Sequence, residues 1–169
     1  MSLNRDAPHF LTVIEANKGI IYKVANAYCR DAENRKDLIQ EIIIQLWLAF
    51  PKYDESYRIT TWMYRIALNV SISFYRKEDR RSGIAQPLHP DIIFLQEDNT
   101  PVGPDSDIAL LHRFIKELKE MDRAIILLYL EENSQQDIAE MLGITPTNVS
   151  TRILRIKEQI RQKFSALKS

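Results

Sequence analysis

The chain has 169 residues, enough for one domain or two small ones, and its 23 basic and 23 acidic side chains cancel. The charge is unevenly spread, because residues 82–107 hold five acidic side chains and no basic one, whereas both flanking parts are mildly basic. The single cysteine, Cys29, excludes an internal disulfide and fits a reducing compartment. The sequence shows no signal peptide, transmembrane run or lipidation motif, so we expect a cytoplasmic protein.

Helical periodicity dominates the first 81 residues. Asp6 and Pro8 indicate the start of a first helix through Glu15, and Gly19 is expected to interrupt it before a second helix over residues 20–29. A third helix is predicted over residues 33–50. Its apolar arc, which we expect in the core, consists of Leu38, Ile39, Ile42, Ile43, Leu46, Trp47 and Phe50.

The opposite side of this third helix mixes carboxylates and amides with large apolar side chains. The outward stripe consists of Asp37, Gln40, Glu41, Ile44, Gln45 and Leu48. Acidic and apolar groups on one stripe suit a partner whose surface is basic with apolar gaps. A solvated face that happens to carry two apolar residues would have the same composition, and the sequence leaves both interpretations open.

The segment after Pro51 interleaves aromatic and basic side chains. We expect residues 52–60 to form a polar loop and residues 61–77 a fourth helix capped by Thr60 or Thr61. The interleaved side chains are Tyr53, Tyr57, Arg58, Trp62, Tyr64, Arg65, Tyr75 and Arg76. Rings that stack on bases, together with cations that follow the backbone, are typical of single-stranded nucleic-acid binding.

The fourth helix is predicted to have two unlike sides. Its buried stripe is expected to be Trp62, Met63, Ile66, Ala67, Val70 and Phe74. Its other flank is expected to be Arg65, Leu68, Asn69, Ile72 and Arg76. For Trp62 we favour a place in the core over a role in base stacking, whereas the loop before the helix favours function.

Residues 82–107 are predicted to be an acidic linker, because six glycines and prolines punctuate them: Gly83, Pro87, Pro90, Pro101, Gly103 and Pro104. Two further helices are expected over residues 108–121 and 122–132. They should pack on the C-terminal part through Leu110, Leu111, Phe114, Leu118, Ile125, Leu128 and Tyr129.

Residues 134–163 have the pattern of a helix-turn-helix. Ser134 with Asp137 forms a capping box, Gly143 can adopt the left-handed conformation that ends a helix, and Thr145 caps the next helix with Pro146 at its first position. The second helix should bury Val149, Ile153, Ile156 and Ile160. Facing away from the core are Asn148, Ser150, Thr151, Arg152, Arg155 and Lys157. This polar, basic face favours DNA recognition over an ordinary helical hairpin with a solvated side.

Several of these runs resemble conserved regions of bacterial sigma factors. The runs that resemble region 2 are Asp37–Glu41 (DLIQE), the pair Leu46-Trp47, and Thr61–Asn69 (TWMYRIALN). The runs that resemble region 4 are Asp137–Gly143 (DIAEMLG) and Val149–Arg155 (VSTRILR). Two such regions with only a short linker are similar to the extracytoplasmic-function (ECF) group of the sigma-70 family. The resemblance implies an all-α protein with two small helical domains, residues 1–81 and 108–169, joined by the linker over residues 82–107.

The resemblance also implies three sets of contacts. The clamp helices of the largest subunit of core RNA polymerase would contact Asp37, Gln40, Glu41, Ile44 and Leu48. The promoter −10 element, with one base flipped into the loop over residues 52–60, would contact Tyr53, Tyr57, Arg58, Arg65, Asn69, Ser73 and Arg76. The −35 element would contact Asn148, Ser150, Thr151, Arg152, Leu154, Arg155 and Lys157. Ser73 and Ser150 replace an asparagine and a basic residue of some members, so we expect shifted sequence preferences.

The implied function is transcription initiation, with core RNA polymerase, promoter DNA and an anti-sigma factor as partners. We expect no catalysed reaction, no cofactor, no small-molecule substrate and no metal site, because His9, His89 and His112 lack ligand spacing and no glycine-rich phosphate loop is present. The alternative is a stand-alone regulator that binds duplex DNA as a dimer. A repressor needs no polymerase-facing surface, so the outward stripe on residues 37–48 discriminates between the two, and an adaptor without a DNA role conflicts with the basic recognition face.

Overall fold

The computed structural model describes residues 7–29, 31–82 and 106–168, and these ranges contain helices and no strands. The chain divides into two compact units, Met1–Glu97 and Asp98–Ser169. The predicted all-α architecture is confirmed. Almost all of the predicted linker over residues 82–107 lies outside the described residues, except that Ser82 ends one helix and Ser106 and Asp107 begin the next. None of the helices in the described ranges combines the length and apolarity that a membrane span requires.

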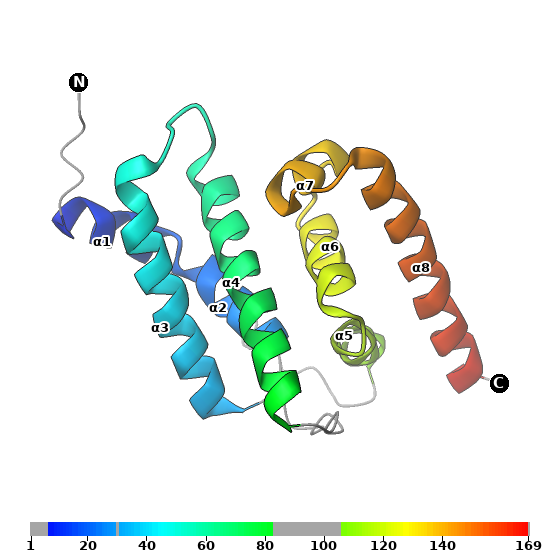
Figure 1. The fold of residues 1–169 in the computed structure, drawn as a ribbon. Coiled ribbons are helices and arrows are strands. Elements are labelled where there is room, and N and C mark those ends of the chain that lie inside the picture. The colour runs from blue at the N-terminus through cyan, green and yellow to red at the C-terminus, as the bar shows by residue number, and fades with distance from the viewer. Residues whose placement is uncertain (1–6, 30, 83–105, 169) are drawn as a thin grey trace. The chain divides into compact units, whose positions relative to one another are not determined.

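Within its described residues, 7–29 and 31–82, the first unit contains four α-helices and one short 3-10 helix. They are α1 (Ala7–Ala16), α2 (Lys18–Tyr28), α3 (Ala32–Ala49), η1 (Phe50–Lys52) and α4 (Ile59–Ser82). Figure 1 labels the α-helices. Helices α2, α3 and α4 pack against one another around a fully buried core (Figure 1). Its largest side chains are Phe50, Ile21, Leu38, Ile42, Leu46, Met63 and Leu68.

Local signals explain where these helices begin. The Asp31 carboxylate accepts a hydrogen bond from the backbone N–H of Asn34 at 2.7 Å, which caps α3. Gly19 does not interrupt the chain as predicted, because α2 already begins at Lys18. The break is at Asn17, whose side-chain amide donates to the Val13 carbonyl at 2.9 Å and so satisfies one open carbonyl at the end of α1.

Helix α4 differs from its predicted form at its start and along its length. The Arg58 carbonyl accepts the first helical hydrogen bond, from Trp62 N at 3.1 Å, so neither Thr60 nor Thr61 is the cap. Leu68 and Ile72, predicted for the outward flank, are buried. The reason is that α4 packs against both α2 and α3, so apolar side chains are covered on two sides of the helix. The buried face is therefore Met63, Tyr64, Ala67, Leu68, Ser71 and Ile72.

The second unit contains α5 (Asp107–Lys116), α6 (Glu120–Leu130), α7 (Gln135–Leu142) and α8 (Pro146–Lys168). The predicted break between its first two helices, at residues 121 and 122, is wrong by several residues. Helix α5 ends at Lys116, and the guanidinium of buried Arg123 donates to the carbonyls of Lys116 at 2.6 Å and Leu118 at 3.0 Å. The first of these bonds satisfies the last carbonyl of α5, and the second holds the connection that leads to α6.

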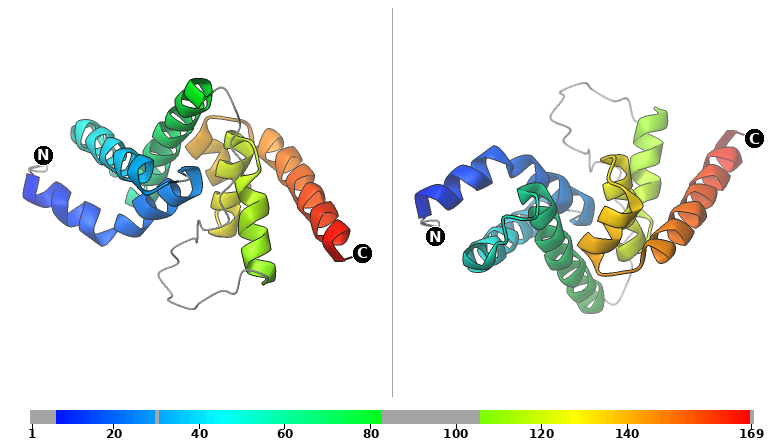
Figure 2. Two further views of the ribbon diagram at one scale, coloured as in Figure 1. Left: turned by 90° about the horizontal axis from the view of Figure 1, so that it is seen from below. Right: turned by 90° about the horizontal axis from the view of Figure 1, so that it is seen from above.

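The helix-turn-helix has the predicted local structure. The Ser134 hydroxyl accepts from Asp137 N at 3.1 Å, Gly143 has φ +71°, and the Thr145 hydroxyl accepts from Asn148 N at 3.1 Å. Val149, Ile153 and Ile156 are buried, as are most apolar side chains of α6 and α7, whereas Ile160, the fourth position of the predicted stripe, is half-buried. Figures 1 and 2 show α8 as one long helix, with α7 near its N-terminal part, and α5 contacts α8 through Phe114 and Phe164.

Candidate functional site

The outward stripe predicted for α3 is exposed at every position except Gln45, which is half-buried. Asp37, Gln40 and Glu41 are exposed. Ile44 is 49% and Leu48 62% exposed, so two large aliphatic side chains lie in water beside the carboxylates. Solvent contact with this much aliphatic surface is unfavourable, which favours a partner on this face over the solvated-face interpretation.

Trp47 extends this stripe, and the prediction that it belongs to the core is wrong. Its side chain is 44% exposed, with one edge packed on Phe10 at a ring separation of 5.1 Å. The predicted helix phase put Trp47 on the arc of Leu46 and Phe50, but it lies between the buried and the exposed arcs. Helix α1 covers only one side of the ring, and the rest joins Ile44 and Leu48 as exposed apolar surface.

The loop between η1 and α4 is held by its own hydrogen bonds. The Tyr53 hydroxyl donates to the Tyr57 carbonyl, and the Asp54 side chain accepts from Ser56 N at 2.9 Å. The Tyr53 ring lies 5.1 Å from the Trp62 ring, so the loop is also anchored to α4. Tyr57, which is 48% exposed, and Arg58 point into solvent and remain available to a ligand.

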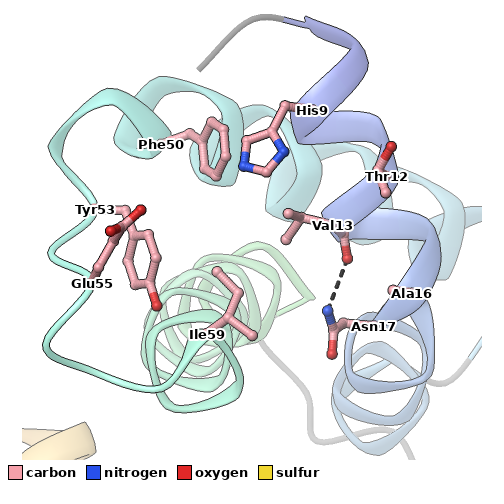
Figure 3. Close-up of a pocket in the computed structure, with 9 residues that line it drawn as sticks. All are labelled: His9, Thr12, Val13, Ala16, Asn17, Phe50, Tyr53, Glu55 and Ile59. Carbon is pink, nitrogen blue, oxygen red and sulfur yellow. Dashed lines mark hydrogen bonds between the residues drawn. The ribbon is translucent and has the colours of Figure 1, made fainter. Parts of the chain in front are cut away.

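A cavity of about 270 Å³ lies between this loop and α1 (Figure 3). Its walls are His9, Thr12, Val13, Ala16, Asn17, Phe50, Tyr53, Glu55 and Ile59. Figure 3 shows the rings of Phe50 and His9 together on one side, with Tyr53 and Glu55 on the loop side. The volume is slightly below the range of about 300–1,000 Å³ for drug-sized ligands, so the cavity suits a smaller group. Sequence reasoning identified the loop but missed the contribution of α1, because nothing local links residues so far apart.

The exposed flank of α4 is narrower than predicted but keeps every predicted DNA-contacting position. Arg65, Asn69, Ser73 and Arg76 are all exposed and follow one another by three or four residues, so they form one stripe along the helix. Trp62 is neither fully core nor free, since it is half-buried between Phe50 and Tyr53. The stripe therefore begins near the aromatic loop and runs away from it along α4.

On α8 the predicted recognition face divides into exposed and partly buried positions. Asn148, Thr151, Leu154, Arg155 and Lys157 are exposed, whereas Ser150 and Arg152 are half-buried. Leu154 is 68% exposed, an unusual place for a leucine on a basic helix. The ammonium group of Lys157 lies 4.6 Å from the centre of the Tyr129 ring, which places it against α6.

Sequence reasoning also missed Asp122, in the first turn of α6. Its carboxylate is 7% exposed and accepts from Arg152 Nη1 at 2.8 Å. It also accepts from Arg155 Nη2, at 3.0 Å through Oδ2 and 3.2 Å through Oδ1. Arg152 Nε donates to Asn148 Oδ1 at 2.9 Å. Both recognition arginines, predicted simply to point outward, are therefore ion-paired to a neighbouring helix.

The histidines gather into no metal-ligand group within the described ranges, where no cluster of three or more histidine, cysteine or acidic side chains occurs. His9 lines the cavity beside Phe50, with the two rings 5.7 Å apart. Burial lowers the pKa of His112, and the positive charge of Lys116 lowers it further. His89 lies outside the described residues.

The two units correspond to two family models. Residues 13–81 match sigma-70 region 2, and residues 108–160 match sigma-70 region 4. The chain is 26% identical over 173 aligned positions to the ECF RNA polymerase sigma factor SigW of Bacillus subtilis, covering 96% of this chain and 92% of SigW. The chain belongs to the sigma-70 family, in its ECF group.

Another ECF sigma factor and two solved structures are also similar to this chain. The ECF RNA polymerase sigma-E factor of Haemophilus influenzae is 27% identical, covering 78% of this chain and 75% of its own. In solved structures, the fold matches RpoE of Bartonella quintana in complex with the anti-sigma factor NepR, with a TM-score of 0.68, 18% identity, and coverage of 94% and 95% of the two chains. It also matches CnrH in complex with the cytosolic domain of CnrY, with a TM-score of 0.66, 18% identity and coverage of 95% and 90%.

Proposed function

We propose that this ECF sigma factor joins core RNA polymerase, recognises the −35 and −10 elements of its promoters and helps to open the DNA. The observation that carries the proposal is the pairing of a region 2 unit with a region 4 unit, in that order, in one chain. A stand-alone dimeric regulator would need only the second unit for DNA binding, and the comparisons do not favour it.

In this proposal the outward stripe of α3 is the polymerase contact. Asp37, Gln40 and Glu41 supply acidic and polar groups for basic residues of the clamp helices, and Ile44 and Leu48 fill apolar gaps between them. The exposed edge of Trp47 adds to the same surface. An aromatic and aliphatic centre with charged neighbours is typical of protein interfaces.

The loop at residues 53–58 and the exposed flank of α4 are the proposed −10 contacts. A base that leaves the duplex loses its stacking, at a cost of a few kcal/mol, and the aromatic walls of the cavity beside Tyr53 can restore it. The unpaired strand then runs along α4, where its contacts are Arg65, Asn69, Ser73 and Arg76. Tyr57 and Arg58 are exposed at the end of the loop that leads into α4.

The N-terminal part of α8 is the proposed −35 reader. A helix-turn-helix inserts this end of its second helix into the major groove, which places Asn148, Thr151 and Arg155 near base edges. The apolar side chain of Leu154 suits a thymine methyl group, and Lys157 lies further along the helix, where phosphate is the expected contact.

Expectations about a further partner, chemistry and location also belong to this proposal. An anti-sigma factor is a proposed partner, because both of the solved relatives above have a bound protein and NepR is described as an anti-sigma factor. The chain itself catalyses no reaction; it acts in the cytoplasm, where core polymerase and the chromosome are found, and nucleotide chemistry belongs to the polymerase. Binding of DNA and of polymerase accounts for its proposed sites without a cofactor.

Gel filtration with purified core RNA polymerase, combined with duplex binding, tests the proposal. We expect the chain to co-elute with core enzyme and to bind promoter fragments tightly only in that complex. Tight binding to a palindromic duplex by the chain alone, with no co-elution, would instead support the dimeric regulator.

A further inference from the structure

Asp122 is a buried carboxylate that belongs to α6, yet its ligands are the two arginines of the recognition helix. Only 7% of its side chain is exposed, whereas Arg152 and Arg155 are 31% and 51% exposed. A buried carboxylate needs close cationic partners to replace its lost contacts with water, and here the two guanidinium groups supply them. Its place in the first turn of α6 also favours a negative charge. The ionic contact is therefore a fixed part of this unit.

The two arginines differ in how many of their side-chain nitrogens are used in contacts within the protein. Arg152 uses Nη1 for Asp122 and Nε for Asn148, so two of its three nitrogens have partners on the protein. Arg155 uses only Nη2, which bridges both carboxylate oxygens. Reading a guanine requires two N–H groups on one edge of the guanidinium, presented together. Arg155 is both the more exposed of the two and the less committed, so it is better suited to that role.

We propose that Asp122 is a positioning residue for −35 recognition: it fixes the Arg155 guanidinium so that its remaining N–H groups face the major groove, with Arg152 as a brace. This inference rests on the proposed function, since it assumes that α8 reads the −35 element. The sequence alone leaves open which of the two arginines reads bases. Arg155 specifies sequence, and Arg152 orders the surface around it.

The proposal predicts opposite effects on specificity and on general affinity. Replacing Asp122 by the isosteric asparagine removes one negative charge from a DNA-binding surface, which strengthens attraction to any phosphate backbone. With the asparagine oxygen kept toward Arg152, its amide group would face Arg155, and two donors would repel each other. Arg155 would then lose its fixed orientation. A residue with only a structural role would instead weaken binding to all DNA alike.

The test uses the full chain in complex with core RNA polymerase and a duplex library randomised over the −35 region. The sequence preferred by the unaltered protein is compared with its single-base variants at two salt concentrations. Asp122→Asn should reduce discrimination at one or more −35 positions at least fivefold, within the roughly 5- to 150-fold that a bidentate arginine supplies. Affinity for unrelated duplex should be unchanged or higher.

Three further variants complete the test. Glu117→Gln is the matched control. It removes an acidic partner of Lys163, which lies nearer the C-terminus of α8 than the two arginines, and it should leave discrimination between −35 sequences unchanged. Arg155→Lys keeps the charge but loses the planar guanidinium, so it should lose discrimination between −35 sequences, and this result can be measured even if Asp122→Asn fails to fold. Arg152→Lys should lose less of that discrimination. Unchanged discrimination in a folded Asp122→Asn, or equal losses for the two lysine variants, would overturn the positioning role. If the unaltered complex showed no −35 preference, the proposed function would fail first.

Discussion

Truncating the exposed apolar side chains of α3 should weaken association with core RNA polymerase and leave the fold intact. Full burial of a leucine or isoleucine is worth about 1.5–3 kcal/mol. Leu48 is 62% and Ile44 49% exposed. A partner that covers both therefore gains about 0.9–1.9 kcal/mol of binding free energy from Leu48 and about 0.7–1.5 kcal/mol from Ile44. The double variant Ile44→Ala, Leu48→Ala should therefore bind core enzyme roughly 10- to 300-fold more weakly.

A titration of fluorescently labelled chain with purified core polymerase measures this loss. Leu11→Ala is the matched control, because Leu11 is 63% exposed on α1 of the same unit but lies outside the α3 stripe. Circular dichroism and thermal melting should give nearly the same stability for all variants, within about 0.5 kcal/mol. If Leu11→Ala weakened binding as much as Leu48→Ala, or if the double variant bound normally, α3 would not be the polymerase contact.

Three more outcomes follow from the proposed sites. Asn69→Ala should lower permanganate reactivity of promoter thymines more than it lowers closed-complex formation, because it acts on unpaired bases; equal losses would contradict this. Lys157→Ala should weaken all duplexes alike and flatten the salt dependence of DNA binding by about one unit, whereas a base-specific loss would assign it to sequence reading. Gly143→Ala should destabilise residues 106–168 by about 1–2 kcal/mol in urea unfolding, since its φ of +71° disfavours a side chain although space is open, and Gly143→Asn should cost less.

The sequence is most informative where a structure is set by neighbouring residues. Ser134, Gly143 and Thr145 each act within four positions along the chain, and the structure confirms all three. The apolar spacing of Val149, Ile153 and Ile156 predicts the buried side of α8 for the same reason. Exposure of the acidic and apolar stripe on α3 is also predicted correctly, except at half-buried Gln45.

Prediction from sequence fails where tertiary packing decides. Leu68 and Ile72 look outward on a helical wheel, but α4 has packing partners on two sides, which no single-helix pattern can show. The opposite error occurs at Trp47, which the helical wheel places in the core. Helix α1 covers only one edge of its ring, and the rest is exposed. Asp122 is 30 residues from Arg152 and 33 from Arg155, so its ionic contact becomes visible only once α6 and α8 are placed together.

Run-off transcription with purified core polymerase, on a library of genomic fragments and with sequencing of the transcript 5′ ends, tests the central claim most directly. We predict that adding the chain produces new transcripts whose start sites share a −35 and a −10 sequence at constant spacing, and that Ile44→Ala, Leu48→Ala reduces them all. Start sites indistinguishable from those of core polymerase alone would contradict the assignment of this chain to promoter recognition.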